Sequence, residues 1–214
     1  MPESGPTGGD VTLQALAGDR AATALLVVDM QNDFLVPGAP VCANGGIRLV
    51  PLIAALARDC RRIGLPVIFT KEMHRADRSD FGIELSFEPP HCLEGSGGEE
   101  IVAGLEPQEG DICIEAKRRY DAFLGTDLEL VLRLRGVQNL LVTGVCTDVC
   151  VISTVQHARN LDFRCFVLSD AVAGTSPQRH AAALLCMSHV FAHVGRSADI
   201  AKAFGLGRDC HGLP

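Results

Sequence analysis

The segment at residues 140–158 places two cysteines where a buried strand gives way to a helix. It reads LLVTGVCTDVCVISTVQHA, with Cys146 and Cys150 four residues apart. A thiolate is the nucleophilic form of cysteine, and its pKa falls beside a cation or at a helix N-terminus. Cys150 is expected in the first turn of the helix that begins near residue 147, so it is the candidate nucleophile. Most cysteines in such a chain only pack in the core, so this interpretation needs partners from elsewhere.

Two such partners end other apolar runs. Asp29 closes the first run and Lys117 closes the third. In an open α/β sheet the ligands bind beyond the carboxyl ends of the strands, so the three side chains are expected on one rim. Lys117 would supply the cation, and Asp29 could take the thiol proton and later deliver it to a leaving amine. Backbone N–H groups of Cys146 and Cys150 would form an oxyanion hole, which suits attack on an amide carbonyl.

Short apolar runs alternate with amphipathic segments along the chain. The patterns predict strands at 23–30, 65–72, 111–117, 139–144, 163–170 and 190–195. They predict helices at 45–64, 126–136, 147–161, 176–189 and 197–204. This alternation indicates an α/β fold, a doubly wound three-layer αβα sandwich with a six-stranded, mostly parallel sheet. The irregular stretch 71–110 is long for a compact domain and is expected to carry function.

The chain is expected to form one domain, residues 11–207, between a flexible tail at 1–10 and a trailing segment at 208–214. Its formal net charge of -7 argues against binding to nucleic acid or to an anionic membrane surface. No apolar run is long enough to span a bilayer and no signal peptide is evident, so a cytoplasmic location is expected. No CxxC pair occurs, and neither Cys146 nor Cys150 begins a C-x5-R motif, which disfavours thioredoxin-type, zinc-ribbon and phosphatase functions.

Three segments resemble one known family. They are ALLVVDMQNDFL at 24–35, KRRYDAFLGTDLELVLRLRGVQNLLVTGVCTDVCVISTVQHA at 117–158, and VLSDAVAG at 167–174. They resemble the isochorismatase-like cysteine hydrolase superfamily, which includes nicotinamidases, N-carbamoylsarcosine amidohydrolase, biuret hydrolase and ureidoacrylate amidohydrolase. The resemblance implies a catalytic triad of Asp29, Lys117 and Cys150. It also implies a cis peptide bond between Val145 and Cys146, which turns the Cys146 N–H toward the substrate carbonyl.

The resemblance also bears on metal and substrate. Nicotinamidases hold a divalent ion with an Asp and two His that follow the second strand. Here the stretch KEMHRADRSDFG offers one imidazole, His74, beside Arg75 and Arg78, so we expect no metal and no cofactor. This departure favours the N-carbamoylsarcosine, biuret and ureidoacrylate branch. An acidic substrate of that branch would need a cation such as an arginine.

We therefore predict a metal-independent amidohydrolase that cleaves a C–N bond of a small carbamoyl or ureido substrate through a cysteine acyl-enzyme and releases ammonia. The candidate substrate-binding residues are Gln31, Phe34, His74, Arg75, Arg119, Tyr120 and Phe123. Three alternatives are a nicotinamidase- or maleamate-type amidase, a non-catalytic binding or regulatory member of the family, and a redox role for the cysteine pair. A homodimer or homotetramer is expected.

Overall fold

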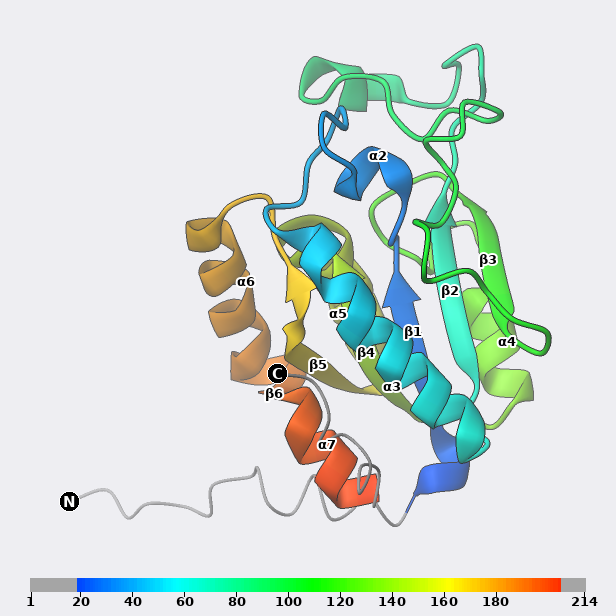
Figure 1. Ribbon diagram of the computed structural model, residues 1–214, viewed down its shortest axis with the longest axis vertical. Coiled ribbons are helices and arrows are strands. Elements are labelled where there is room, and N and C mark those ends of the chain that lie inside the picture. Colours follow the sequence, from blue (N-terminus) through cyan, green and yellow to red (C-terminus); the bar gives the residue numbers. More distant parts are fainter. Residues whose placement is uncertain (1–18, 205–214) are drawn as a thin grey trace.

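The computed structural model describes residues 19–204 (Figure 1). The predicted tails at 1–10 and 208–214 lie outside the described residues, as do both ends of the predicted domain. Within the described part of the chain, no helix combines the length and apolarity needed to cross a membrane.

A six-stranded sheet forms the centre of the molecule. Its strands are β1 (Thr23–Val28), β2 (Val67–Glu72), β3 (Ile112–Lys117), β4 (Asn139–Val145), β5 (Arg164–Ala173) and β6 (Ala192–Gly195). The strand order is β3-β2-β1-β4-β5-β6, and every neighbouring pair is parallel. The doubly wound α/β prediction is confirmed, and the sheet is wholly rather than mostly parallel. The chain leaves β1 in one direction and returns to β4 on its other side, so the switch point lies between these two strands.

Helices cover both faces of this sheet. On one face α3 (Val50–Arg62) and α7 (Ser197–Phe204) pack on a core that includes Leu25 and Val27 of β1. On the other face α4 (Leu128–Leu134), α5 (Ile152–Asn160) and α6 (Pro177–Val190) pack on a core that includes Ala24, Leu26 and Val28. The alternation of β1 residues between two cores follows from the period of two along a strand. Because both faces are buried, the strand reads as a continuous apolar run.

Several predicted helices start or end differently from their patterns. The segment predicted as one helix from 45 opens with a 3₁₀ turn, Gly46–Leu49, before α3. The helix predicted from 147 opens with a π-helical turn, Thr147–Val151, before α5. Two further 3₁₀ turns span Arg20–Ala22 and Gly82–Ser86, and the four-residue helix α2 (Asn32–Leu35) was not predicted.

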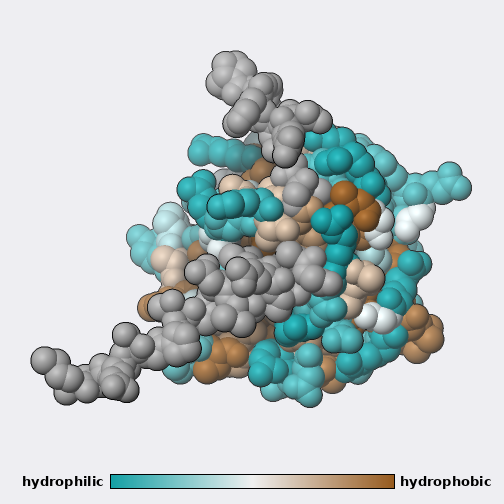
Figure 2. Space-filling view, turned by 90° about the horizontal axis from the view of Figure 1, so that it is seen from below, coloured by the Kyte–Doolittle hydropathy of each residue, from teal (hydrophilic) through white to brown (hydrophobic). Residues whose placement is uncertain are grey.

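The long segment between β2 and β3 lies over the carboxyl ends of the strands (Figure 1). It contains no strand, and isolated bridges join His74 to Leu93 and Gln31 to Ile101. The opposite side of the molecule, at the amino ends of the strands, is seen from below in Figure 2. Its visible surface is largely hydrophilic, with separate small hydrophobic patches. The segment over the carboxyl ends is therefore the feature that encloses the rim where the candidate residues lie.

Candidate active site

The three candidate catalytic side chains meet at the carboxyl ends of β1, β3 and β4. The Lys117 Nζ lies 2.8 Å from Asp29 Oδ2 and 3.8 Å from Cys150 Sγ. All three residues are buried; Asp29 and Lys117 are fully excluded from solvent. The structure thus places the acid, the cation and the thiol in direct contact, as sequence reasoning predicted.

A fourth buried residue joins this group. Glu72 ends β2, and its Oε2 accepts a hydrogen bond from Lys117 Nζ at 2.5 Å and lies 3.9 Å from Cys150 Sγ. Its Oε1 is 2.9 Å from Nε2 of His91. The ammonium group of Lys117 is consequently shared between two carboxylates, those of Asp29 and Glu72.

The pKa values of the two carboxyl groups, Glu72 and Asp29, are shifted in opposite directions. Burial would raise the pKa of Glu72, but Lys117 and the two imidazoles of His74 and His91 hold it well below its usual value. Burial raises the pKa of Asp29, because Lys117 opposes that effect only in part and the charge of Glu72 adds to it. Asp29 is therefore the carboxyl group with the greater affinity for a proton, as a general base requires.

The pKa values of Cys150, the candidate nucleophile, and of Lys117 are shifted as well. Burial raises the pKa of Cys150 well above its usual value, although Lys117 counteracts this. Burial would lower the pKa of Lys117, but Asp29, Cys150 and Glu72 together raise it well above normal. These shifts favour a neutral thiol beside a protonated lysine, so a thiolate would form only if a base accepted the thiol proton.

Local backbone geometry fixes the position of Asp29. Its φ is 47°, and its N–H donates to Thr70 Oγ1 at 3.1 Å. The same hydroxyl donates to Asp29 Oδ1 at 2.5 Å. Thr70 lies on the adjacent strand β2, so the sheet itself orients the carboxylate. On the other side, Gly144 of β4 approaches Val28 so closely that a Cβ atom would lie 2.1 Å from the Val28 carbonyl oxygen.

The nucleophile lies in the π-helical turn that follows β4. The peptide bond between Val145 and Cys146 is cis, at the predicted place. The carbonyl oxygen of Cys146 accepts hydrogen bonds from the N–H groups of Val149 and Val151, which ties the two ends of the turn together. Isolated π turns occur often at functional sites, because they re-aim side chains of an otherwise regular helix.

A narrow pocket with a cavity volume of about 10 Å³ lies beside Cys150. Its lining residues are Phe34, Val41, Glu72, Glu88, His91, Tyr120, Cys146, Val149, Cys150 and Thr175. Phe34 and Tyr120 were predicted to bind substrate, and the structure places both on the wall. Gln31, His74, Arg75, Arg119 and Phe123 were also predicted, and none of them lines this pocket.

The five other side chains have structural roles or face elsewhere. The side-chain amide of Gln31 is used fully by backbone: it donates to the carbonyl oxygens of Glu72 and Glu99 at 2.7 Å and accepts from the Glu72 N–H at 2.8 Å. Phe123 packs in the core against Phe163, with ring centroids 5.9 Å apart. Neither side chain lines the pocket beside Cys150, because the scaffold uses the amide group of Gln31 and the aromatic ring of Phe123.

The two predicted arginines, Arg75 and Arg119, also lie outside the lining of this pocket. Arg119 donates to the carbonyl oxygens of Asp80 and Arg118, at 2.7 and 2.5 Å. Arg75 is exposed, and its backbone N–H donates to the Asp80 carboxylate at 3.1 Å. Both guanidinium groups therefore lie outside the pocket.

His74 belongs to a buried cluster that the sequence analysis did not recognise. One ligand atom from each of Glu72, His74, Glu84 and His91 lies within 4.8 Å of the others. His74 and Glu84 are buried. His74 Nε2 lies 3.4 Å from Glu72 Oε1 and its Nδ1 lies 3.4 Å from Asp80 Oδ1, but among the described residues none of the side-chain nitrogen and oxygen atoms of His74 and Glu84 has a partner in hydrogen-bond geometry. The prediction of a metal-free protein assumed a single imidazole after the second strand. That assumption was wrong, because His91 and Glu84 arrive from later in the same segment.

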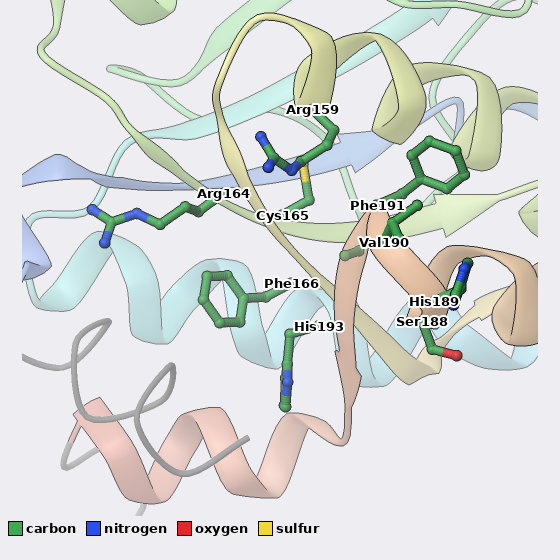
Figure 3. A pocket seen from close by; sticks show the side chains of 10 residues that line it. Arg159, Arg164, Cys165, Phe166, Ser188, His189, Val190, Phe191 and His193 are labelled. Atoms are coloured by element: carbon green, nitrogen blue, oxygen red, sulfur yellow. The ribbon is translucent and has the colours of Figure 1, made fainter. Parts of the chain in front are cut away.

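A second, larger pocket of about 280 Å³ lies at the amino ends of β5 and β6 (Figure 3). Its charged side chains already have partners: Arg164 pairs with Asp19 at 2.6 Å and Arg159 with Asp162 at 3.4 Å. None of the triad residues lines it. The pocket beside Cys150 is therefore the candidate active site.

The fold and the site together define an α/β protein with a buried acid, lysine and thiol at the switch point of a parallel sheet. The sequence model of the isochorismatase domain matches residues 23–199. The chain belongs to the isochorismatase family of hydrolases. A protein of Arabidopsis thaliana described as a probable inactive nicotinamidase is 36% identical over 176 residues, which cover 78% of this chain and 89% of that protein.

A ureidoacrylate amidohydrolase of Caulobacter segnis is 29% identical over 210 residues, 87% of each chain. Among solved structures, an isochorismatase family protein of Desulfovibrio vulgaris matches with a TM-score of 0.79 and 35% identity, over 86% of this chain and 98% of that one. A pyrazinamidase of Pyrococcus horikoshii, solved in complex with zinc, matches with a TM-score of 0.75 and 30% identity, over 82% and 99%. Relatives of this chain therefore include hydrolases of C–N bonds.

Proposed function

We propose that this protein is a cysteine amidohydrolase that cleaves a C–N amide bond of a small molecule with Asp29, Lys117 and Cys150. The observation that carries the proposal is the position of Lys117 Nζ, 2.8 Å from Asp29 Oδ2 and 3.8 Å from Cys150 Sγ. A cation in contact with both a proton acceptor and a thiol stabilises the thiolate that forms during attack.

The reaction follows from these contacts. Asp29 accepts the thiol proton while the sulfur of Cys150 forms a bond to the amide carbon. Backbone N–H groups of Cys146 and Cys150 donate to the oxyanion. The C–N bond then breaks, Asp29 returns the proton to the leaving nitrogen, and a thioester remains. A water molecule gives its proton to Asp29 and attacks the thioester, which releases the acid and restores the thiol.

The size of the pocket limits the substrate. Ligand pockets commonly enclose about 300–1,000 Å³, whereas this cavity of about 10 Å³ has room for about one water molecule. A substrate therefore requires the lining side chains to move apart, and a small carbamoyl, ureido or primary amide needs the least displacement. The names of the relatives leave both a ureido substrate and a nicotinamide-like substrate open. The panel of amides used to measure ammonia release therefore includes both.

The buried cluster of Glu72, His74, Glu84 and His91 fits a divalent cation. Two imidazoles and two carboxylates are ligands that zinc and similar metals take, and four donors are present. The atoms of His74 and Glu84 that lack a partner within the described residues are what such an ion would satisfy. A bound ion would supply a Lewis acid close to the pocket, since Glu72 and His91 also line it. This proposal replaces the expectation of a metal-free protein.

Metal content tests the cluster without reference to activity. Purified protein should retain about one divalent ion per chain, and His74→Ala and His91→Ala proteins should lose it. A control, His189→Ala, changes an imidazole at the amino ends of the strands and should retain the ion. Equal metal content in all four proteins would show that the cluster does not bind the ion.

Ammonia release tests the proposed reaction. The panel contains biuret, an N-carbamoyl amino acid, ureidoacrylate, maleamate and nicotinamide, each with the metal-loaded and the chelator-treated protein. Hydrolysis of at least one compound that Cys150→Ala lowers by about 10⁴-fold or more is expected, as for other catalytic nucleophiles. Hydrolysis that persists in the Cys150→Ala protein would contradict the proposal.

The alternative is a binding protein without turnover. One relative is described as a probable inactive nicotinamidase, so the family name alone does not guarantee catalysis. Tight binding of an amide by the unmodified protein, with no ammonia released by either form, would favour this alternative. Self-association as a dimer or tetramer and the small-molecule partner remain predictions.

A further inference from the structure

The mouth of the catalytic pocket contains an acidic side chain that neither the triad nor the metal cluster uses. An open groove of about 620 Å³ adjoins the pocket, and the two share Glu88, Val149 and Thr175 among their lining residues. These three residues therefore mark the junction between the space around Cys150 and the surface. The part of a substrate farthest from its scissile bond must pass or occupy this junction.

Glu88 gives the junction a negative charge. Its side chain is half-buried, and among residues 19–204 no lysine, arginine or histidine pairs with its carboxylate. Its charge also acts on Tyr120 in the pocket. The pKa of Tyr120 is raised to about 12, first by burial and then by the charges of Glu84 and Glu88.

The basic side chains that line the groove and the pocket belong to other contacts. Arg179 lines the open groove but not the catalytic pocket, and it donates to Thr175 Oγ1 at 3.3 Å. Asp148 also lines the groove and accepts from the Thr175 N–H at 2.8 Å, so an acidic group lies beside that arginine. Within the pocket itself, His91 is engaged by Glu72 at 2.9 Å. None of these groups neutralises Glu88.

We propose that the site selects amides that carry a protonated amine or another cationic hydrogen-bond donor at the end away from the scissile bond, and that Glu88 receives that group. The inference rests on the proposed amide hydrolysis and names its substrate class. A carboxylate substrate would bring a second negative charge to Glu88 in a partly desolvated place, which is unfavourable. The proposed substrate is therefore cationic, whereas assignment of Arg75 and Arg119 to substrate binding would predict an anionic substrate.

Three primary amides of matched length test the proposal. They are β-alaninamide, which is cationic, butanamide, which is neutral, and succinamate, which is anionic. We expect kcat/KM to fall in that order, with the cation preferred over the anion by about tenfold to a hundredfold, the usual range for a hydrogen bond to a charged group. Glu88→Gln should remove most of this ratio and Glu88→Lys should reverse it. Glu109→Gln removes a carboxylate from the loop at the amino end of β3 and should leave the ratio unchanged.

Calorimetric binding of the same compounds to Cys150→Ala protein separates this inference from the proposed reaction. If no amide is hydrolysed but the cation binds best and Glu88→Gln abolishes that preference, the charge selection stands and amide hydrolysis fails. If amides are hydrolysed with no dependence on charge, or succinamate is preferred and Arg179→Gln removes that preference, the inference is overturned and hydrolysis stands. Failure of all three compounds to bind also overturns it.

Discussion

Replacing Lys117 by methionine should destabilise the protein strongly and in a pH-dependent manner. Methionine retains most of the length of the side chain and removes only its charge. Lys117 is fully buried between the carboxylates of Asp29 and Glu72, at 2.8 and 2.5 Å. Without the ammonium group these two carboxylates remain buried next to each other with no shared cation.

The expected loss can be worked from these distances. At 2.8 Å and an effective dielectric constant of about 20, one such pair has a Coulomb energy of roughly 6 kcal/mol. Desolvation offsets much of that in the intact site, and removal of one partner from a buried pair costs about 3–5 kcal/mol. For a domain of this size each kcal/mol lowers Tm by about 2–4 °C, so we expect a drop of roughly 6–20 °C at pH 7.5.

The pH dependence has a definite sign. The low folded-state pKa of Glu72 contributes stability above its unfolded value of about 4.3, and that stability is lost as pH falls through the folded value. In the Lys117→Met protein, burial without a cation raises the carboxyl pKa values above the unfolded ones, so these groups destabilise the fold above about pH 4. The difference in Tm between the two proteins should therefore be largest near pH 7.5 and shrink toward pH 4.5.

Calorimetry of chelator-treated protein at both pH values measures this directly. Lys202→Met, which removes an exposed lysine from α7, is the matched control and should change stability by no more than about 0.5 kcal/mol. A Tm for Lys117→Met within the range of that control, or a loss that is the same at both pH values, would refute the account of a cation shared by two buried carboxylates.

Three further substitutions probe the surroundings of the triad. Thr70→Val should cost about 1–3 kcal/mol in denaturant titrations and lower kcat, because it removes both hydrogen bonds to Asp29; unchanged kcat would show that the hydroxyl does not orient the base. Gly144→Ala should cost about 2–5 kcal/mol, since its φ is 106° and the new Cβ would meet Val28; a stable, fully active protein would disprove the close approach of β1 and β4. Cys146→Ser should retain ammonia release, because only the backbone of that residue is assigned a role; inactivation equal to that of Cys150→Ala would point to a dithiol reaction.

The strand ends explain how much of the site the sequence could predict. Asp29, Lys117 and Cys150 follow apolar runs of a parallel sheet, and the carboxyl ends of such strands share one edge. Their meeting point is therefore a consequence of topology. The cis peptide bond between Val145 and Cys146 could be predicted only from the family resemblance, because no residue type at that position indicates it.

Residues from the segment between β2 and β3 could not be placed in this way. Glu84, Glu88 and His91 lie in a stretch with one 3₁₀ turn and no strand, so no periodicity indicates which side chains face inward. A signal did exist: Glu72, His74, Glu84 and His91 are four potential metal ligands within 20 residues, two of them at i and i+2. The stretch that directly follows the second strand, residues 71–82, contains only His74 of the two imidazoles, and Glu84 and His91 come after it.

Charge alone does not identify the residues that contact substrate. Arg75 and Arg119 looked suited to a carboxylate because of their position in the sequence. The structure shows Arg119 bound to backbone carbonyl oxygens and Arg75 exposed. A guanidinium group satisfies loop carbonyls as readily as it binds a ligand, and sequence does not distinguish the two uses.

The most direct test of the central claim is the mass of the protein during turnover. The protein is mixed with a hydrolysed amide, quenched with acid within the first turnovers, digested and analysed by mass spectrometry. The account predicts an acyl group on the peptide that contains Cys150, absent from the Cys150→Ala protein and lost when the quench is delayed until substrate is exhausted. Turnover with no acylated Cys150 at any time, or with the acyl group on another residue, would contradict it.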